Sequence, residues 1–315
     1  MDLISIPANP VPEGAITGTL KTPDGVALRF ARWRPPPGRK GTICLFHGRT
    51  EFIEKYFEVV RDAQARGFAV ATIDWRGQGL SDRALDDPRK GHVRDFSEYD
   101  TDLETFMKEI VMPDCPPPYY GLAHSMGATV LIRAGHHGKR WFDRVVLSAP
   151  MIDLDGRPGS NAARRTAKML RMLGFGTSYI PGGGATAVTS QPFLGNPVTS
   201  DPVRYERAAA IVEAEPKLGL GAPTIGWLAA AFRTMDELAT PTYAWRIRLP
   251  MLMVAAGQDE IVSVPAIGDF ATRTRSSSHV VIPGCRHEPM MEQDRYRSQF
   301  WAAFDAYVPG TPLFG

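Results

Sequence analysis

Short apolar runs recur along this chain, and most of them are followed by a segment with helical periodicity. The five clearest runs are residues 41–46, 68–74, 119–123, 144–148 and 251–256. Continuous apolar runs of this length are typical of strands buried on both faces, and their alternation with helices favours a parallel sheet. A hairpin is expected at 17–22 and 26–33, and a last strand at 279–282. We therefore predict an α/β protein whose mostly parallel sheet has about eight strands, with helices on both faces.

The alternation of strands and helices is interrupted between residues 151 and 246. Helical periodicity returns in three stretches of this interval, 161–173, 202–213 and 223–238. A length of 315 residues suits one core with a sizeable insertion, because single hydrophobic cores stop growing at roughly 250 to 300 residues. We expect residues 1–150 and 247–315 to form the two parts of the core, with 151–246 inserted as a helical cap, or lid, domain.

The strand expected at 119–123 runs directly into a helix at the sequence Ala123-His124-Ser125-Met126-Gly127. This pentapeptide is a variant of the G-x-S-x-G nucleophile elbow, with alanine in the first small position. A nucleophile on so sharp a turn needs small neighbours, because the helix packs back against the strand within a few residues. The helix also directs backbone N–H groups toward the place where negative charge would develop. Taken alone, the motif fits either a nucleophilic serine or a serine that caps a helix.

An acid and a histidine follow two later strands, in the chain order that such an elbow requires. Asp259 comes just after the strand 251–256, and His287 comes after the strand that ends at Ile282. Each alone has a structural interpretation, as a turn aspartate or a histidine without a chemical role. Because parallel strands end at one edge of a sheet, we expect Ser125, Asp259 and His287 to meet there as a catalytic triad. The predicted chemistry is acyl transfer through Ser125.

The oxyanion hole of such a site uses two backbone N–H groups. One belongs to Met126, the residue after the nucleophile, and the other to the loop after the strand 41–46. Gly48 permits a turn that aims an amide of this loop inward, so the N–H of Arg49 is the second expected donor. His47 is expected to brace the loop. The histidines have no zinc-binding spacing and no phosphate-binding glycine loop is present, so neither a metal nor a cofactor is expected.

Four further stretches complete the pattern: 47–51 (HGRTE), 74–81 (DWRGQGLS), 91–93 (GHV) and 122–127 (LAHSMG). Together they resemble the bacterial lysophospholipases and the related monoacylglycerol lipases. The resemblance covers nearly all of the first 150 residues, resumes near Asp259 and His287, and is weak in between. It implies the α/β-hydrolase fold and hydrolysis of a single-chain lipid ester, either lysophospholipid or monoacylglycerol. The spacing of the residues by itself indicates acyl transfer and no particular substrate.

The sequence leaves other functions open. The same triad could serve an esterase, a thioesterase or a peptidase that acts on a non-lipid acyl group. A protein of another class would keep the hydrolase fold and bind a ligand without catalysis. The intact triad argues against this possibility. Trp227 and Phe232 lie at near-helical spacing and are candidates for lining an acyl pocket, although such residues are also typical of a core.

Charge and cysteine content bear on partners and compartment. A net charge of +2 gives no reason to expect nucleic acid as a partner. The three cysteines are far apart, and the N-terminal residues lack the pattern of a secretory signal, so we expect a cytoplasmic protein. The basic and apolar stretch 164–173 fits peripheral contact of the cap with the inner face of the membrane, or equally an ordinary helix with a solvated basic face. The sequence indicates no oligomeric state.

Overall fold

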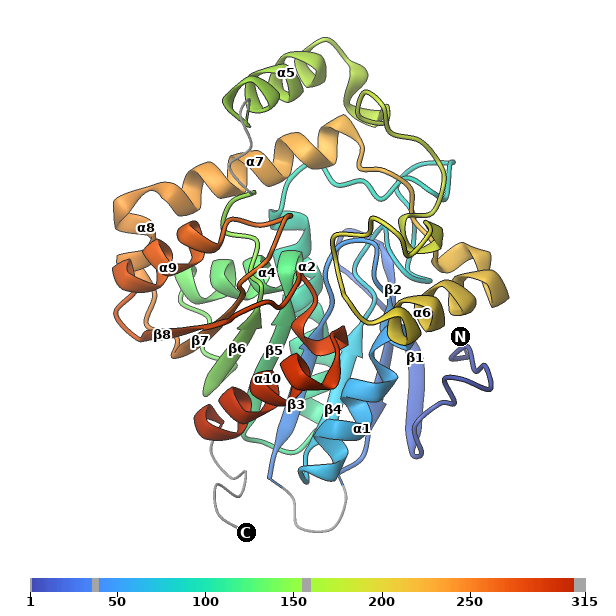
Figure 1. Cartoon of the computed structure of the whole chain (residues 1–315), viewed down its shortest axis with the longest axis vertical. Helices are drawn as coiled ribbons and strands as arrows, with labels where there is room; N and C mark the ends of the chain where they lie inside the picture. The colour runs from blue at the N-terminus through green and yellow to red at the C-terminus, as the bar shows by residue number, and fades with distance from the viewer. Residues whose placement is uncertain (1, 36–39, 155–159, 309–315) are drawn as a thin grey trace.

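The computed structural model describes residues 2–35, 40–154 and 160–308 of the chain. At its centre lies one sheet of eight strands in the order β1-β2-β4-β3-β5-β6-β7-β8 (Figure 1). β1 and β2 pair antiparallel, as do β2 and β4, whereas all neighbours from β4 to β8 are parallel. The strands are β1 Ala15–Lys21, β2 Ala27–Trp33, β3 Thr42–Phe46, β4 Ala69–Ile73, β5 Tyr119–His124, β6 Arg144–Ser148, β7 Met251–Ala256 and β8 Ser277–Ile282. The predicted mostly parallel sheet is confirmed.

Helices cover both faces of the sheet, and each face has its own apolar cluster. On one face lie α1 (Phe57–Ala65) and α10 (Asp294–Tyr307). The other face is covered by α2 (Ser97–Phe106), α4 (Ser125–His136) and α9 (Val264–Arg273). Strands β3, β4 and β7 are buried along their whole length, as a sheet covered on both faces requires.

Two helices differ in detail from the periodicity of the sequence. The helix α2 continues as a π-helical turn at Met107–Val111 and ends in the short α3, Met112–Asp114. Pro113 follows the π-helical turn and has no backbone N–H to donate to a regular helix. The helix α1 is preceded by a 3₁₀ turn at Ile53–Tyr56.

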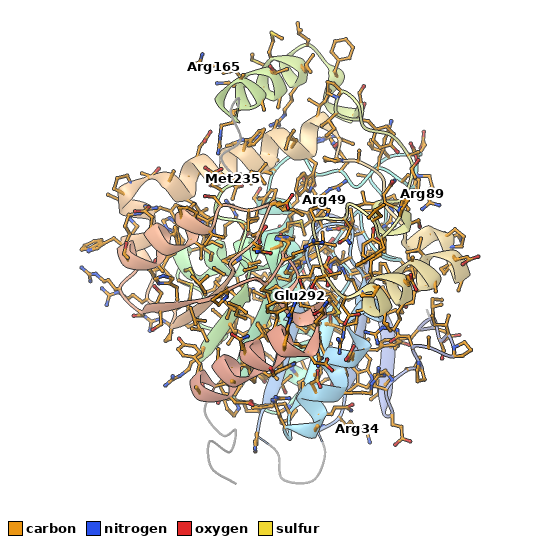
Figure 2. The ribbon with its side chains drawn as sticks, viewed as in Figure 1. Arg34, Arg49, Arg89, Arg165, Met235 and Glu292 are labelled. Atoms are coloured by element: carbon orange, nitrogen blue, oxygen red, sulfur yellow. The ribbon has the colours of Figure 1, made fainter. Side chains whose placement is uncertain are left out.

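The segment that interrupts the alternation lies beyond the carboxyl ends of the parallel strands (Figure 1). Its helices are α5 Ser160–Met172, α6 Pro202–Ala214, α7 Ile225–Ala239 and α8 Pro241–Arg246. The helix α5 packs along α7 and forms the outer end of the molecule, where Arg165 points away from the core (Figure 2). The helix α8 packs instead against α4 and α9 of the core. Between α5 and α6 the chain is mostly irregular, with short 3₁₀ turns at Phe175–Thr177 and Val188–Ser190.

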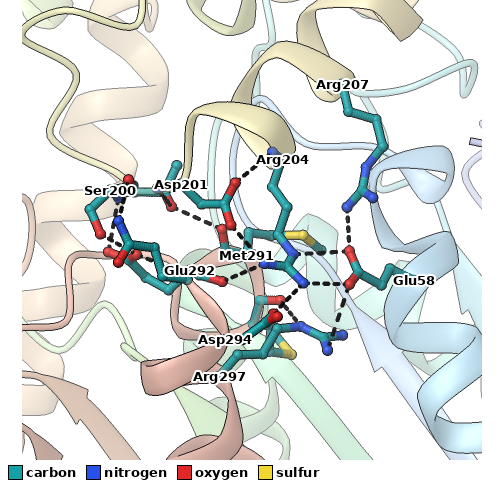
Figure 3. A network of polar contacts seen from close by, with 12 residues as sticks. Glu58, Ser200, Asp201, Arg204, Arg207, Met291, Glu292, Asp294 and Arg297 are labelled. Atoms are coloured by element: carbon teal, nitrogen blue, oxygen red, sulfur yellow. Dashed lines mark hydrogen bonds and ion pairs between the residues drawn. The ribbon is translucent and has the colours of Figure 1, made fainter. Parts of the chain in front are cut away.

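An ion-pair network joins α6 to the core helices α1 and α10 (Figure 3). Arg204 on α6 donates to both carboxylate oxygens of Glu58 on α1, at 2.6 and 3.0 Å, and to Asp294 at the start of α10, at 2.7 Å. Arg207 and Arg297 pair with the same Glu58. Since several partly buried charges share these partners, the network should hold α6 more firmly than an isolated surface pair would.

Candidate active site

Ser125 stands at the sharp junction of β5 and α4, and the junction explains why its neighbours are small. Ser125 has a φ of 48°, in the left-handed region that residues with a side chain seldom adopt. A Cβ on Gly127 would lie 2.5 Å from the carbonyl oxygen of His47 and 2.9 Å from that of Phe46. Glycine at this position therefore lets the first turn of α4 approach the end of β3. Ala123, in the other small position, is fully buried.

The structure brings Ser125, His287 and Asp259 into one chain of hydrogen bonds. Nε2 of His287 lies 3.1 Å from Oγ of Ser125, and Nδ1 of His287 lies 2.7 Å from Oδ2 of Asp259. The carboxylate requires a proton on Nδ1, which leaves Nε2 free to accept the hydrogen of the serine hydroxyl. This arrangement has the geometry of a nucleophile, a base and an orienting acid.

Asp259, the last residue in this series of hydrogen bonds, is held in its ionised form. Its Oδ1 accepts hydrogen bonds from the backbone N–H groups of Ile261 and Val262, at 2.8 and 2.9 Å. Burial alone would raise the pKa of Asp259, but the hydrogen bond from His287, its charge and the two backbone donors outweigh burial and hold the pKa below its ordinary value. A carboxylate is therefore present at neutral pH.

In the loop after β3, the N–H of Arg49 lies between two backbone N–H groups that donate hydrogen bonds to side chains. The N–H of Gly48 donates to Oε2 of Glu51 at 2.5 Å, and the N–H of Thr50 donates to Oε1 of Gln78 at 2.7 Å. Within the described part of the chain, the Arg49 N–H has no such acceptor. Met126 lies in the first turn of α4, where backbone N–H groups lack a partner within the helix. Met126 follows Ser125 in the chain, and Arg49 follows Gly48, where an added Cβ would lie 3.2 Å from Cβ of Ser125.

A buried polar network, which the sequence did not predict, contacts the residues next to Ser125 and His287. His124, the residue before Ser125, lies with Nδ1 2.9 Å from Oε2 of Glu51 and with Nε2 3.0 Å from the backbone oxygen of His287. Lys55 donates to Glu51 at 2.9 Å and to Glu288 at 2.6 Å. The available signals were the position of His124 inside the elbow and the four-residue spacing of Glu51 and Lys55.

His124 carries protons on both ring nitrogens. Each nitrogen faces an acceptor, the Glu51 carboxylate or the His287 carbonyl oxygen, so both must donate. Burial would lower the pKa of His124, but the charge of Glu51 and its hydrogen bond raise the pKa above its ordinary value. The pKa of Glu51 is held well below its usual range, because His124 and Lys55 outweigh the effect of burial. A fixed imidazolium therefore lies directly beside His287.

His47 and Asp74 lie beneath the loop. Nδ1 of His47 is 2.7 Å from the carbonyl oxygen of Gly48, and Nε2 is 3.6 Å from Oδ1 of Asp74. Asp74 also pairs with Arg29 and accepts the N–H of Ile53 at 3.0 Å. These contacts tie the loop to the 3₁₀ turn that precedes α1, in keeping with a bracing role for His47.

The two candidate pocket residues lie in different surroundings. Nε1 of Trp227 donates to the hydroxyl of Tyr99 at 3.1 Å, and its ring faces the guanidinium of Arg49 at 5.1 Å. Phe232 lies further along α7, where it lines a cavity of about 440 Å³ between α5 and α7. The guanidinium of Arg164 covers its ring at 4.9 Å. Trp227 is therefore close to the loop of the site, whereas Phe232 faces α5.

A second cavity, of about 350 Å³, adjoins the site on the side of α6. Thr50, Ile261 and Glu288 line its inner end, and each follows closely on a residue of the site. Its outer wall is formed by residues 188–198 and Tyr205 of the inserted segment. Ser125, Asp259 and His287 themselves do not line it.

The described part of the chain contains neither a candidate metal site nor a candidate membrane span. Among the described residues, no three histidine, cysteine, aspartate or glutamate side chains are grouped so as to hold a metal ion. The helices of the same residues include none that is both long and apolar enough to cross a membrane.

Residues 37–294 match the family described as serine aminopeptidase, S33. The chain belongs to that family. Among its relatives, lysophospholipase L2 of Escherichia coli strain K12 is 30% identical to this chain over 285 residues, which span 87% of this chain and 82% of the relative. The expected relation to the lysophospholipases, and the class of carboxylic-ester hydrolase, are thereby confirmed.

Solved structures show the same fold as this S33-family chain. A thermostable carboxyl esterase from Bacillus coagulans superimposes with a TM-score of 0.73 at 19% identity, over 95% of this chain and 99% of the esterase. A monoglyceride lipase from Saccharomyces cerevisiae superimposes with a TM-score of 0.71 at 17% identity, over 93% of this chain and 95% of the lipase. The predicted α/β-hydrolase fold is confirmed.

Proposed function

We propose that this protein hydrolyses carboxylic esters of single-chain lipids, lysophospholipid or monoacylglycerol, through an acyl-enzyme on Ser125. The observation that carries the proposal is the hydrogen-bonded chain from Asp259 through His287 to Ser125. The relatives named for lysophospholipase and monoglyceride lipase activity support the substrate class. The cavity on the side of α6, lined in part by Thr50, Ile261 and Glu288, offers room for part of such a lipid.

The mechanism follows from the geometry of the site. Oγ of Ser125 attacks the acyl carbonyl carbon while Nε2 of His287 takes its proton. Asp259 holds the imidazolium that forms, and the N–H groups of Arg49 and Met126 stabilise the oxyanion. The intermediate collapses, His287 returns the proton to the leaving alcohol, and the acyl group stays on Ser125. A water activated by His287 then releases the fatty acid and restores the serine.

Two other functions remain as alternatives. The family description names an aminopeptidase, so an amide or a non-lipid ester or thioester is the rival substrate. A catalytically silent binding protein would be the rival of a different class. The hydrogen-bonded residues Ser125, His287 and Asp259 alone do not discriminate among acyl groups, because esters, thioesters and amides all react through the same kind of tetrahedral intermediate.

A fluorophosphonate probe tests the nucleophile. We expect the wild-type protein to be labelled and Ser125→Ala to remain unlabelled, with Ser148→Ala, a buried serine at the end of β6, as the control that keeps labelling. A substrate panel of lysophosphatidylcholine, monoacylglycerol, short p-nitrophenyl esters and aminoacyl amides then tests the acyl group. Preference for the amides would overturn the lipid proposal, and a folded wild type without labelling would favour the binding protein.

We further infer that α5 makes peripheral contact with an anionic membrane. Large apolar side chains at its end are exposed: Met169 at 50%, Met172 at 72%, Leu173 at 64% and Phe175 at 51%. Arg165 and Lys168 are exposed on the same helix, which carries no acidic residue. Apolar side chains beside cations fit the headgroup region of an anionic bilayer, and α5 lies at the outer end of the molecule (Figure 2). Such contact is in keeping with a cytoplasmic protein acting at the inner membrane face.

Co-sedimentation with vesicles tests this contact. We expect binding to vesicles that contain phosphatidylglycerol, and weaker binding to pure phosphatidylcholine. Arg165→Glu with Lys168→Glu should reduce binding by about fivefold for each charge removed. Met172→Ser, which removes an apolar side chain that is 72% exposed, should also weaken binding, and Val203→Ser on α6, where Val203 is 70% exposed, is its matched control and should bind as the wild type does. Equal binding by the charge variant and the wild type would contradict the inference.

A further inference from the structure

The arginine that follows Gly48 is charged, partly buried and without a carboxylate partner. The buried Arg29 pairs with Glu54 and Asp74, and the buried Arg76 pairs with three carboxylates. Partly buried Arg83 and Arg286 lack an ion pair among the described residues, and their guanidinium groups donate to carbonyl oxygens instead. Within the described part of the chain, Arg49 forms no ion pair, and its Nε is buried with no hydrogen-bond acceptor. Since removing a cation from water is costly without a counter-charge, this arrangement points to an anion that completes the site.

The surroundings of Arg49 compensate its charge only in part. One Nη donates to the carbonyl oxygen of Gly221 at 2.9 Å, and the guanidinium lies 5.1 Å from the centre of the Trp227 ring. Burial lowers the pKa of Arg49 to about 10, against a small opposing effect of Tyr99 and Tyr179. The guanidinium therefore stays cationic at neutral pH, with a donor to spare.

The position of Arg49 relates this charge to the reacting ester. A Cβ on Gly48, the preceding residue, would lie only 3.2 Å from Cβ of Ser125. From that point the Arg49 side chain extends toward the inserted segment, and Figure 2 shows it between the ends of the strands and α7. An ester whose carbonyl lies between Ser125 and the Arg49 N–H, and whose alcohol portion points toward the inserted segment, would have the guanidinium of the same residue beside that portion.

We propose that the Arg49 guanidinium binds the phosphate of a lysophospholipid held at Ser125, and so selects lysophospholipid over neutral monoacylglycerol. Only the glycerol carbons separate the phosphate from the scissile ester in such a lipid. The planar fork of an arginine matches two phosphate oxygens, and a hydrogen bond between charged groups is stronger than a neutral one. This inference rests on the proposed function and names the member of the substrate class that the site prefers.

Steady-state kinetics on two lipids with the same acyl chain test the selection. The quantity measured is the ratio of kcat/KM for lysophosphatidylcholine to kcat/KM for monoacylglycerol. We expect Arg49→Gln to lower this ratio about tenfold or more, chiefly through KM for the phospholipid, and Arg49→Lys to recover part of it. Arg89→Gln is the matched control, because Arg89 also donates to a carbonyl oxygen of the inserted segment, Gly219 at 3.1 Å.

The outcomes separate this inference from the proposed function. An unchanged ratio in Arg49→Gln overturns the role of Arg49. An equal loss of kcat/KM for both lipids also overturns it, because a variant that merely loosens the inserted segment would show that result. A wild type that reacts with a fluorophosphonate but cleaves neither lipid overturns the proposed function itself. Should Arg49→Gln not fold, glycerophosphocholine is the probe: it should inhibit wild-type cleavage of a neutral p-nitrophenyl ester better than glycerol does. Equal inhibition by the two compounds would overturn the inference.

Discussion

At the scale of single residues, the site depends on side chains that touch the proposed triad without belonging to it. His124 holds the backbone oxygen of His287 at 3.0 Å and shares Glu51 with Lys55. The centres of the imidazole rings of His124 and His287 are 4.8 Å apart, so a charge on one ring interacts electrostatically with the other. Since a base must keep its orientation through two proton transfers, His124 acts as a positioning residue in the proposed mechanism.

Replacing His124 by glutamine should change both the rate and its pH dependence. We expect kcat/KM to fall about tenfold, because His287 loses a charge-assisted hydrogen bond that holds its backbone. The acid limb of the kcat/KM profile should move to higher pH, because the positive charge 4.8 Å from the His287 ring is lost while Glu51 keeps its partner Lys55. The measurement is a pH profile with a soluble ester. A lower rate with an unmoved acid limb would indicate that His124 only supports the fold.

At the scale of elements, the position of α4 is set by how closely its first turn approaches β3. The sequence predicted that a helix begins at Ser125, and α4 begins there. The closeness of the approach rests on Gly127, because the carbonyl oxygens of His47 and Phe46 lie where a side chain would be. Backbone atoms cannot move aside as a flexible side chain can, so this contact fixes the elbow.

Gly127→Ala should therefore be far more harmful than another glycine-to-alanine change in the same helix. We expect it to lower stability by about 1 to 3 kcal/mol and to abolish probe labelling of Ser125, because α4 must shift away from β3. Gly135→Ala is the control, since its Cβ would lie 3.2 to 3.3 Å from the side chains of Ile247 and Leu249 and alanine favours a helix. Thermal unfolding and probe labelling measure both. Equal effects of the two substitutions would contradict this explanation.

At the scale of the whole molecule, the inserted segment is tied to the core at separate places. Arg204 and Arg207 on α6 bind Glu58 on α1, and Arg233 on α7 binds Asp95 just before α2. These contacts join parts of the chain that are far apart in sequence. Arg204 also lines the cavity on the side of α6, so its ion pairs hold one wall of that cavity in place.

Glu58→Gln should destabilise the protein in a pH-dependent manner. Burial would raise the pKa of Glu58, but hydrogen bonds from Arg204 and the charges of Arg297 and Arg207 lower it to about 2. A lowered carboxyl pKa stabilises the fold above the unfolded value of about 4.5, and this contribution is lost as the pH falls toward 2. We therefore expect Glu58→Gln to lower the unfolding temperature by a few degrees at pH 7 and the difference from wild type to shrink below about pH 4.5.

Glu104→Gln provides the comparison for this prediction. Glu104 pairs with Lys108 and Lys139, which are largely exposed, so its loss should change the unfolding temperature little at any pH. A difference between Glu58→Gln and wild type that persists unchanged at pH 3 would show that the ionised carboxylate is not the source of the stabilisation.

The sequence by itself determined the features that depend on neighbouring residues and on chain order. Apolar runs gave the strands, periodicity gave most helices, and Ser125, Asp259 and His287 were predicted from their places after strands. Parallel strands end at one edge, so order along the chain was enough to predict that these three residues meet.

Only the tertiary structure decided which side chains complete the site. The contact of His124 with Glu51 spans 73 residues, and that of Lys55 with Glu288 spans 233. The placement of Arg49 against Trp227 and Gly221 likewise depends on how the inserted segment folds over the sheet. No periodicity encodes such contacts, because they depend on side-chain packing between elements whose relative positions local sequence does not fix.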